Sequence, residues 1–360
     1  VPNLDLFPIE IWRRLQEKRW RKLPDNALGY GDAAGWPGLR LLLAQRLAAT
    51  RGLKCDVGQV FIVSSAAAAL RLACLALHAR GSKVWVEDPG YKRTFSTLGL
   101  AGAEIVPIGV DEQGLVVERG REFAPFAQLA VVTPAAQFPT GAPMSKQRRR
   151  ALLDWAESAG AWIIEDDYDA DFAFEREAPP ALASERRNAR VLHVSTLNSL
   201  MFPALQIAAI AVPEALVSRF QATLHALQGS TNTPAQIVAA DFIESGQLAT
   251  HLRRCREVFG ERRAALRGAL TSRLGGHVRL APQPVGLHVT AWLPAGQDDC
   301  QVERDAATDG LVVHSLNSCS LNSDAHRPGI YMGFANYSPA VIEQAVAKLA
   351  RVVEARFVQR

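Results

Sequence analysis

Short apolar runs alternate with longer amphipathic stretches over the first two thirds of the chain. Several of the runs are apolar throughout, which is typical of strands that are covered on both faces of a sheet. Seven strands are therefore predicted, at Val60–Val63, Lys83–Val86, Glu104–Ile108, Leu129–Val132, Trp162–Glu165, Val191–Val194 and Ile207–Val212.

The stretches between these runs have helical periodicity. Helices are expected over 35–50 and 66–79, and a third should begin after Ser145, a residue type that caps helix N-termini well. Strands that alternate with helices, and that are themselves hydrophobic, favour a doubly wound sheet. The predicted fold class is α/β, with a seven-stranded, mostly parallel sheet flanked by helices.

The pattern changes after Val212. Helices are expected over 213–229 and 233–274, followed by a β-rich remainder and a final helix from Ser338 to Arg356. The β-rich runs are His277–Leu280, Gly286–Trp292, Gly310–His314 and Gly329–Phe334. We therefore expect an N-terminal arm over 1–34 that packs on the body, a large α/β domain over 35–250, and a smaller α+β domain over 251–360.

Composition narrows the class of protein. The chain has 360 residues, 48% hydrophobic and 21% charged, which is ordinary for a globular protein of two domains. No apolar run reaches the ~20 residues of a membrane span, and the first residues do not resemble a signal peptide. The five cysteines are scattered and suggest neither a disulfide framework nor a metal pair, so a cytoplasmic location is expected.

Charge gives little indication of a nucleic-acid surface. The net charge is +4, and the arginine clusters at 148–150 and 253–263 have acidic residues interleaved along the same expected helices. Such a pattern favours solvated helix faces over a DNA footprint. Asp167, Asp169 and Asp171 are spaced like a calcium loop, but Phe172 and Ala178 stand where that loop needs glycine and glutamate, so no metal site is expected.

Polar and aromatic residues follow five of the predicted strands. They are Ser64-Ser65-Ala66, Glu87-Asp88-Pro89-Gly90-Tyr91, the stretch 133–141, Glu165-Asp166-Asp167-Tyr168 and Ser195-Thr196. In an open α/β sheet, ligands bind outside the carboxyl ends of the strands. The sequence therefore predicts one ligand cleft built from these five segments. Asp166 as a simple cap and Tyr91 as ordinary packing remain alternatives.

The motifs in this order resemble the fold-type-I aminotransferases, which use pyridoxal phosphate (PLP), and in particular the aminotransferase-like domain of MocR-type regulators of the GntR superfamily. The matching stretches are Leu6-Phe7-Pro8, Tyr30-Gly31-Asp32, Glu87-Asp88-Pro89-Gly90-Tyr91, Gln137-Phe138-Pro139-Thr140-Gly141, Glu165-Asp166-Asp167-Tyr168-Asp169, Phe202-Pro203-Ala204-Leu205 and Gly286-Leu287-His288. In these regulators the domain follows a winged-helix DNA-binding domain, which this chain does not contain. The resemblance also implies a homodimer.

The resemblance assigns cofactor-site positions to individual residues. It implies that Asp166 pairs with the pyridinium nitrogen, that Tyr168 bonds the ring hydroxyl and that Tyr91 stacks on the ring. The remaining positions of the PLP site, by the same resemblance, are Gln137, Ser65, Ala66, Thr196, Ser199 and Gln206.

Several of these positions depart from the family pattern. Ser199 stands where the family has its Schiff-base lysine, Gln206 where it has the phosphate-binding arginine, and Ser65-Ala66-Ala67 where it has a Gly-Ser/Thr-Gln turn. No lysine occurs between Lys146 and Lys348. Serine cannot form an imine, and replacing the arginine by glutamine loses a contact of about 1.5–3 kcal/mol. We expect no catalytic residues and no covalent PLP.

Three functions remain open at this point. The first is a non-enzymatic effector and dimerisation domain of a MocR-like regulator that binds a small molecule. The second is a working PLP aminotransferase, which would need Lys54, Lys83, Lys92 or Lys146 as its imine lysine. The third is a sensor that holds PLP, pyridoxamine phosphate or an amino acid weakly and non-covalently through Asp166, Tyr168 and Tyr91.

Overall fold

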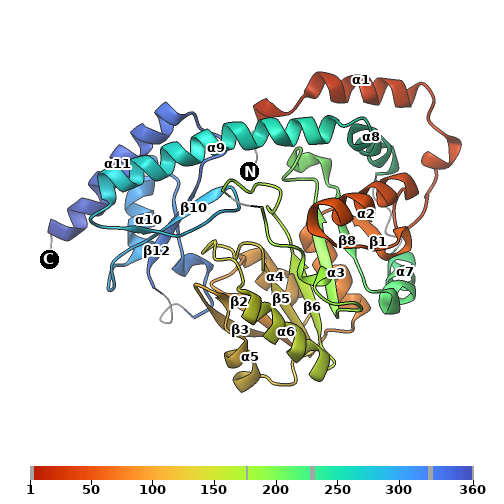
Figure 1. Ribbon diagram of the computed structural model, residues 1–360, viewed down its shortest axis with the longest axis horizontal. Coiled ribbons are helices and arrows are strands. Elements are labelled where there is room, and N and C mark those ends of the chain that lie inside the picture. Colours follow the sequence, from red (N-terminus) through yellow and green to blue (C-terminus); the bar gives the residue numbers. More distant parts are fainter. Residues whose placement is uncertain (1–3, 176, 228–231, 323–326, 359–360) are drawn as a thin grey trace.

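The computed structural model describes residues 4–175, 177–227, 232–322 and 327–358. It contains an eight-stranded sheet of order β1-β8-β7-β6-β5-β2-β3-β4 and a four-stranded sheet of order β11-β12-β10-β9 (Figure 1). The strands of the large sheet are β1 (Val60–Val63), β2 (Lys83–Asp88), β3 (Glu104–Asp111), β4 (Gly114–Leu115), β5 (Leu129–Val132), β6 (Trp162–Asp166), β7 (Val191–Thr196) and β8 (Ala208–Ala211).

The predicted α/β fold is confirmed, with one correction to the strand count. All seven predicted strands are present, and β2, β3, β5, β6 and β7 are parallel neighbours. The eighth strand, β4, has two residues and pairs antiparallel with the end of β3. A two-residue strand has no periodicity of its own, so only its pairing with β3 defines it.

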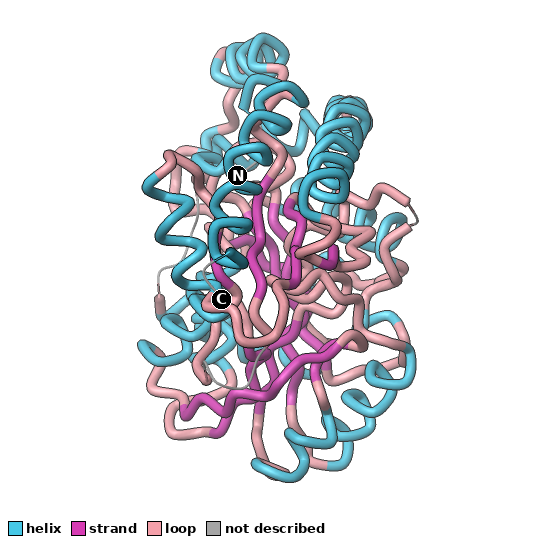
Figure 2. Tube along the Cα trace, turned by 90° about the vertical axis from the view of Figure 1, so that its left-hand side faces the viewer, coloured by secondary structure: helices cyan, strands magenta, loops and turns pink. Residues whose placement is uncertain are grey.

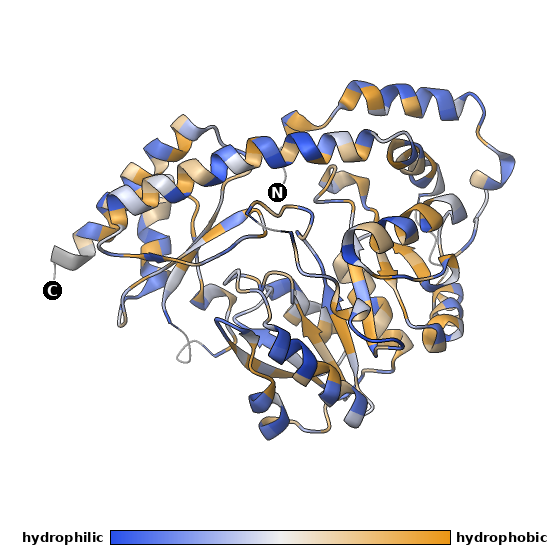
Figure 3. Ribbon diagram, in the orientation of Figure 1, coloured by the Kyte–Doolittle hydropathy of each residue, from blue (hydrophilic) through white to orange (hydrophobic). Residues whose placement is uncertain are grey.

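Helices cover both faces of the large sheet (Figure 2). On one face α3 (Ala66–Ala76), α4 (Lys92–Leu100) and α7 (Val217–Ala226) share a core with the strands. On the other, α5 (Val117–Phe123) and α6 (Lys146–Ser158) form a second core. Successive strand residues face opposite sides, so β2 places Val86 in the first core and Trp85 in the second. The strands lie between these cores as apolar segments (Figure 3).

Two of the predicted helices are shorter than expected. The stretch expected as one helix over 233–274 is divided into α8 (Thr233–Glu244) and α9 (Gln247–Leu274). Gly246 separates them with φ 75°, a left-handed conformation that glycine adopts readily and that ends a helix. The helix expected over 213–229 is a 3₁₀ turn, Glu214–Leu216, followed by α7, and residues 228–231 lie outside the described part.

The second sheet is antiparallel and lies beside three helices. Its strands are β9 (Arg279–Leu280), β10 (His288–Trp292), β11 (His314–Ser315) and β12 (Gly329–Gly333). α10 (Asp299–Thr308) and α9 both contact α11 (Pro339–Val358). The division expected at position 250 falls inside α9 and stays a prediction.

The N-terminal arm packs on the body through aromatic side chains. α1 (Ile9–Trp20) and the turn before it bury Phe7 and Trp12, whose rings lie 4.8 and 5.5 Å from that of Phe202. Arg19 forms a bidentate ion pair with Asp241 of α8. α2 (Pro37–Arg51) follows and packs against both α8 and β1. None of the described helices has the length and apolarity of a membrane span.

Candidate functional site

Three of the predicted site residues meet at the carboxyl ends of the strands. Ala66 opens α3, Tyr91 precedes α4 and Asp166 ends β6, and all three line one small pocket of about 20 Å³. Strand residues Val131, Ile164 and Val194 form its floor. The crossing connections of the parallel strands bring these three segments together, as expected for an α/β sheet.

Asp166 is the acidic group of this pocket. It is half-buried, and burial together with the neighbouring Asp167 and Asp169 carboxylates raises the pKa of Asp166 to about 7, against the opposing effect of His193. A carboxyl group in this state can accept a hydrogen bond from a ligand when ionised and donate one when protonated.

Two tyrosines flank the pocket through a shared aromatic contact. The Tyr91 ring lies 5.5 Å from the Phe138 ring and the Tyr168 ring lies 6.0 Å from it, both edge to face. The Tyr168 hydroxyl donates to the Ala136 carbonyl at 3.1 Å. Burial raises the pKa of Tyr168 well above its ordinary value, so this hydroxyl stays protonated and acts as a donor.

Ser199 lies next to this group but its hydroxyl already has a partner. Its Oγ donates to the main-chain carbonyl of Tyr168 at 3.1 Å. Asn198 holds the same loop in place, since its amide donates to the Ser64 carbonyl at 3.0 Å and accepts from the Ile207 amide at 2.8 Å. The chain after β7 is thereby tied to the start of α3.

The other predicted site residues do not join the pocket. Gln137 is buried and its side chain bonds the Pro89 carbonyl at 2.8 Å and the Thr140 hydroxyl at 2.6 Å. Ser65 caps α3 by accepting from the Ala68 amide at 3.1 Å. Thr196 accepts from the Asn198 amide at 3.0 Å and lines a separate pocket of about 30 Å³. Gln206 is exposed, with φ 53°.

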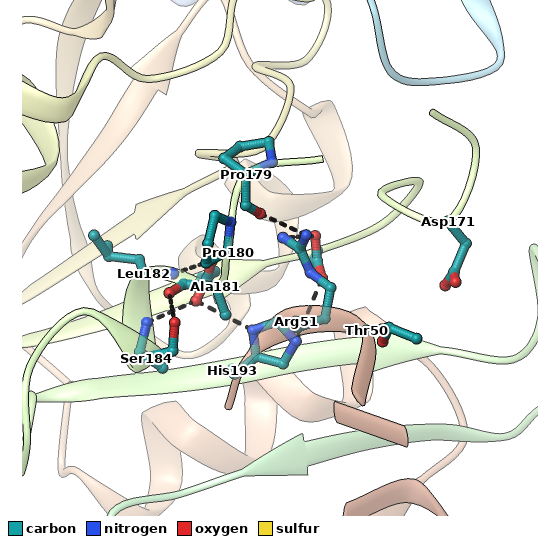
Figure 4. A network of polar contacts seen from close by, with 12 residues as sticks. Thr50, Arg51, Asp171, Pro179, Pro180, Ala181, Leu182, Ser184 and His193 are labelled. Atoms are coloured by element: carbon teal, nitrogen blue, oxygen red, sulfur yellow. Dashed lines mark hydrogen bonds and ion pairs between the residues drawn. The ribbon is translucent and has the colours of Figure 1, made fainter. Parts of the chain in front are cut away.

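A buried ionic network lies directly behind Asp166, and the sequence reasoning missed it (Figure 4). His193 of β7 is fully buried, 3.1 Å from a Glu165 oxygen and 3.4 Å from an Asp167 oxygen. Arg51 of α2 pairs with Asp167 at 2.6 and 3.1 Å and donates to the Pro179 carbonyl at 2.6 Å. Strand alternation is the signal that could have revealed it, because Glu165 and Asp167 must face opposite to Asp166.

The network keeps its own charges and fixes a loop. Burial alone would lower the pKa of His193, but Glu165 and Asp167 together raise it, and His193 holds the pKa of Glu165 at about 2 against its burial. Glu165 also accepts from the Leu182 and Ala183 amides at 2.8 and 3.2 Å. The end of β6 is thus held rigidly, and Asp166 with it.

The residues present fit PLP only in part. Asp166, Tyr168 and Tyr91 can serve a pyridine ring, but no lysine occurs between positions 146 and 348 to form the imine. Lys92 opens α4 on the exposed surface, and Lys83 pairs with Glu104 at 3.5 Å. Gln206 is neutral and exposed, so it supplies no charge for a phosphate. At these positions, neither the imine nor the family's arginine contact to the PLP phosphate is therefore provided.

Comparison with known proteins defines the family. Residues 3–349 match the family "Aminotransferase class I and II", and the chain belongs to it. This family is PLP-dependent, and the confirmed fold is that of the fold-type-I aminotransferases.

Among the relatives are both regulators and enzymes. The chain is 30% identical over 348 residues to the probable rhizopine catabolism regulatory protein MocR of Rhizobium meliloti, covering 97% of this chain and 70% of that protein. It is 25% identical to aromatic-amino-acid aminotransferase 1 of Thermococcus litoralis, covering 98% and 86%. The kynurenine aminotransferase of Pyrococcus horikoshii, solved with PMP, superposes with a TM-score of 0.90 at 22% identity, over 99% of this chain and 89% of that one.

Proposed function

We propose that this chain is the aminotransferase-like effector and dimerisation domain of a MocR-type transcriptional regulator, and that it neither binds PLP covalently nor transaminates. The observation that carries the proposal is the lysine-free stretch between positions 146 and 348, with Ser199 at the position of the imine lysine by family resemblance. Serine has no amine, so the bond that holds PLP in this family cannot form there.

The relatives support the regulatory half of the proposal. The chain covers 70% of the MocR protein, so that protein has additional length in which other functions reside. DNA would be bound through an N-terminal winged-helix domain. The aminotransferase-like domain described here would supply a small-molecule site and a dimer contact, in a protein of the cytoplasm. Transcriptional control, rather than turnover, would be the output of ligand binding.

A second candidate is a sensor that holds PLP or an amino compound without a covalent bond. The retained trio of Asp166, Tyr168 and Tyr91 favours it, because Asp166 and Tyr91 line the pocket and Tyr168 follows Asp166 closely in the chain, independently of any lysine. Loss of the phosphate arginine weakens such binding by about 1.5–3 kcal/mol, roughly 10- to 100-fold.

The decisive experiment is titration of the purified chain with PLP. We expect no imine absorbance band, and no phosphopyridoxyl mass on the protein after borohydride reduction. Lys54→Ala, Lys83→Ala, Lys92→Ala and Lys146→Ala are the matched variants. A trapped adduct that disappears in one of them would contradict the proposal and establish the aminotransferase alternative.

Calorimetry separates the two remaining candidates. Heat with PLP or pyridoxamine phosphate that is reduced in Asp166→Asn would establish the non-covalent sensor. No heat with millimolar concentrations of either compound would dismiss it and leave the effector domain with a different ligand.

A further inference from the structure

A second and larger cavity, of about 220 Å³, lies between the two sheets. It is distinct from the Asp166 pocket, which none of its lining residues shares. Its walls come from both parts of the molecule and are mostly apolar. The large sheet and its loops contribute Pro89, Val110 and Pro143, and the small sheet and its loops contribute Pro282, Trp292 and Leu316.

The two carboxylates at this cavity each have an arginine of their own. Asp111 accepts from Arg148 at 3.0 Å, and Glu112 pairs with Arg279 across the gap between the sheets. Both acids are thereby offset by a neighbouring positive charge, and an incoming anion meets little net repulsion from them.

Arg327 is an arginine of the cavity lining itself. Its guanidinium lies over the Trp292 ring, 5.7 Å from the centroid, and it pairs with no carboxylate among the residues that the structure describes. A guanidinium on an aromatic face presents its N–H groups outward in a planar fork, which suits a carboxylate.

We propose that this cavity binds a small carboxylic acid with a planar apolar body. The carboxylate pairs with Arg327, and the body packs against Trp292 and the prolines of the opposite wall. The volume is below the roughly 300–1,000 Å³ of sites for drug-sized ligands, which limits the body to about one or two rings.

One chain segment, Pro89 to Tyr91, links the wall of the cavity to the wall of the Asp166 pocket. Pro89 lines the cavity and Tyr91, two residues further on, lines the pocket. The segment between them is tied to the small domain, because the Gly90 amide donates to the Cys319 carbonyl at 2.9 Å and Asp88 accepts from Ser320 Oγ at 2.7 Å. A ligand that touches both walls binds best to one arrangement of the two sheets. Because the segment that carries Tyr91 is tied to both sheets, such a ligand also affects the position of Tyr91.

The regulatory meaning of this contact rests on the proposed function, whereas the binding itself does not. A MocR-type effector domain would then receive a second input, separate from the ligand at Asp166.

Calorimetric titration of the full chain with phenylacetate tests the site. We expect saturable binding in the wild type, and affinity at least tenfold lower in Arg327→Gln and in Trp292→Ala, with near-UV circular dichroism confirming that both variants fold. The matched control is Arg253→Gln, an exposed arginine of α9 that is not among the lining residues of the cavity, which should change the affinity less than twofold. Absence of heat at millimolar phenylacetate, or equal affinity in Arg327→Gln, would overturn the proposal.

Two further titrations fix the charge and the location of the ligand. 2-Phenylethylamine, the cationic counterpart, should bind at least tenfold more weakly than phenylacetate, and equal or stronger binding would refute the carboxylate assignment. Asp166→Ala should leave phenylacetate affinity unchanged. If Asp166→Ala abolishes it, the ligand occupies the Asp166 pocket, and this inference fails while the proposed function stands. A trapped PLP adduct in the borohydride experiment would instead overturn the proposed function and leave this inference standing.

Discussion

Three consecutive acidic residues at the end of β6 have three different environments. Glu165 and Asp167 face the ionic network around His193, whereas Asp166 faces the pocket with Tyr91. Burial acts on all three, but only Glu165 and Asp167 have cationic partners in contact. Burial and the neighbouring carboxylates raise the pKa of Asp166 to about 7, which makes its charge responsive to a bound ligand near neutral pH.

This raised pKa makes a prediction about stability. A carboxyl whose folded-state pKa lies above its unfolded value stabilises the fold when protonated, and that contribution is lost as the pH rises from about 4 to about 7. The unfolding free energy of Asp166→Asn minus that of the wild type should therefore increase with pH. This difference should be about 2 kcal/mol larger at pH 8 than at pH 5. Urea unfolding at both pH values measures it.

The control is Asp154→Asn on the exposed side of α6, where Asp154 pairs with Arg186. Its effect on the unfolding free energy should be the same at the two pH values. If the unfolding free energy of Asp166→Asn minus that of the wild type instead decreases with rising pH, Asp166 is ionised in the folded protein and has a stabilising partner.

At the scale of elements, helix ends and tight glycines determine how the segments meet. Ser145 caps α6 by accepting from the Arg148 amide at 3.3 Å, as its residue type indicated. Gly35, before α2, has φ +99°, and an added Cβ would lie 2.5 Å from Ile62 Cβ and 2.9 Å from Gln236 Oε1. Only glycine allows α2, β1 and α8 to approach this closely.

Gly35→Ala should therefore destabilise the chain by about 2–4 kcal/mol, through both the backbone strain and the overlap with Ile62. Gly268→Ala is the matched control, because Gly268 is exposed in α9 and its added Cβ would have no neighbour within 4 Å. This control should stabilise the chain by about 0.5–1 kcal/mol, the difference in helix propensity. Chemical denaturation compares the two, and equal effects would contradict the close approach at Gly35.

At the scale of the whole molecule, the arm over 4–34 has one buried side and one exposed side. Phe7 and Trp12 pack inward, whereas Trp20, Leu28 and Tyr30 are 57%, 68% and 93% exposed. Large apolar side chains left exposed along one segment mark an interaction surface. This surface supports the proposed homodimer.

Leu28→Asp combined with Tyr30→Asp should convert the dimer into a monomer, weakening association at least ~100-fold because carboxylates would be buried at the contact. Sedimentation velocity over a range of concentrations measures it. Phe126→Asp is the control, since Phe126 is 87% exposed in the turn after α5, at the opposite end of the molecule from α1 (Figure 1). Unchanged dimerisation in the arm variant would place the interface elsewhere.

The sequence by itself determined most of the secondary elements, the fold class and the residue types that stand at the predicted cofactor site. Short apolar or β-rich runs predicted the seven main strands, because a strand that is buried on both faces has an apolar local composition. The lysine-free stretch is likewise a property of the sequence alone. The two-residue β4 and the break at Gly246 were missed, because β4 is too short to show a periodicity and is defined only by its pairing with the end of β3, and the break depends on a single backbone conformation.

Only the tertiary structure decided which side chains meet. Gln137 and Ser65 share the strand-end region with Asp166, yet their hydrogen bonds hold local backbone, while Ala66 and Tyr91 reach the pocket. The partners in the His193 network are separated by up to 142 positions, and Arg327 lies far along the chain from Pro89. Such contacts arise from how strands cross and sheets face one another, and no local pattern of residues records them.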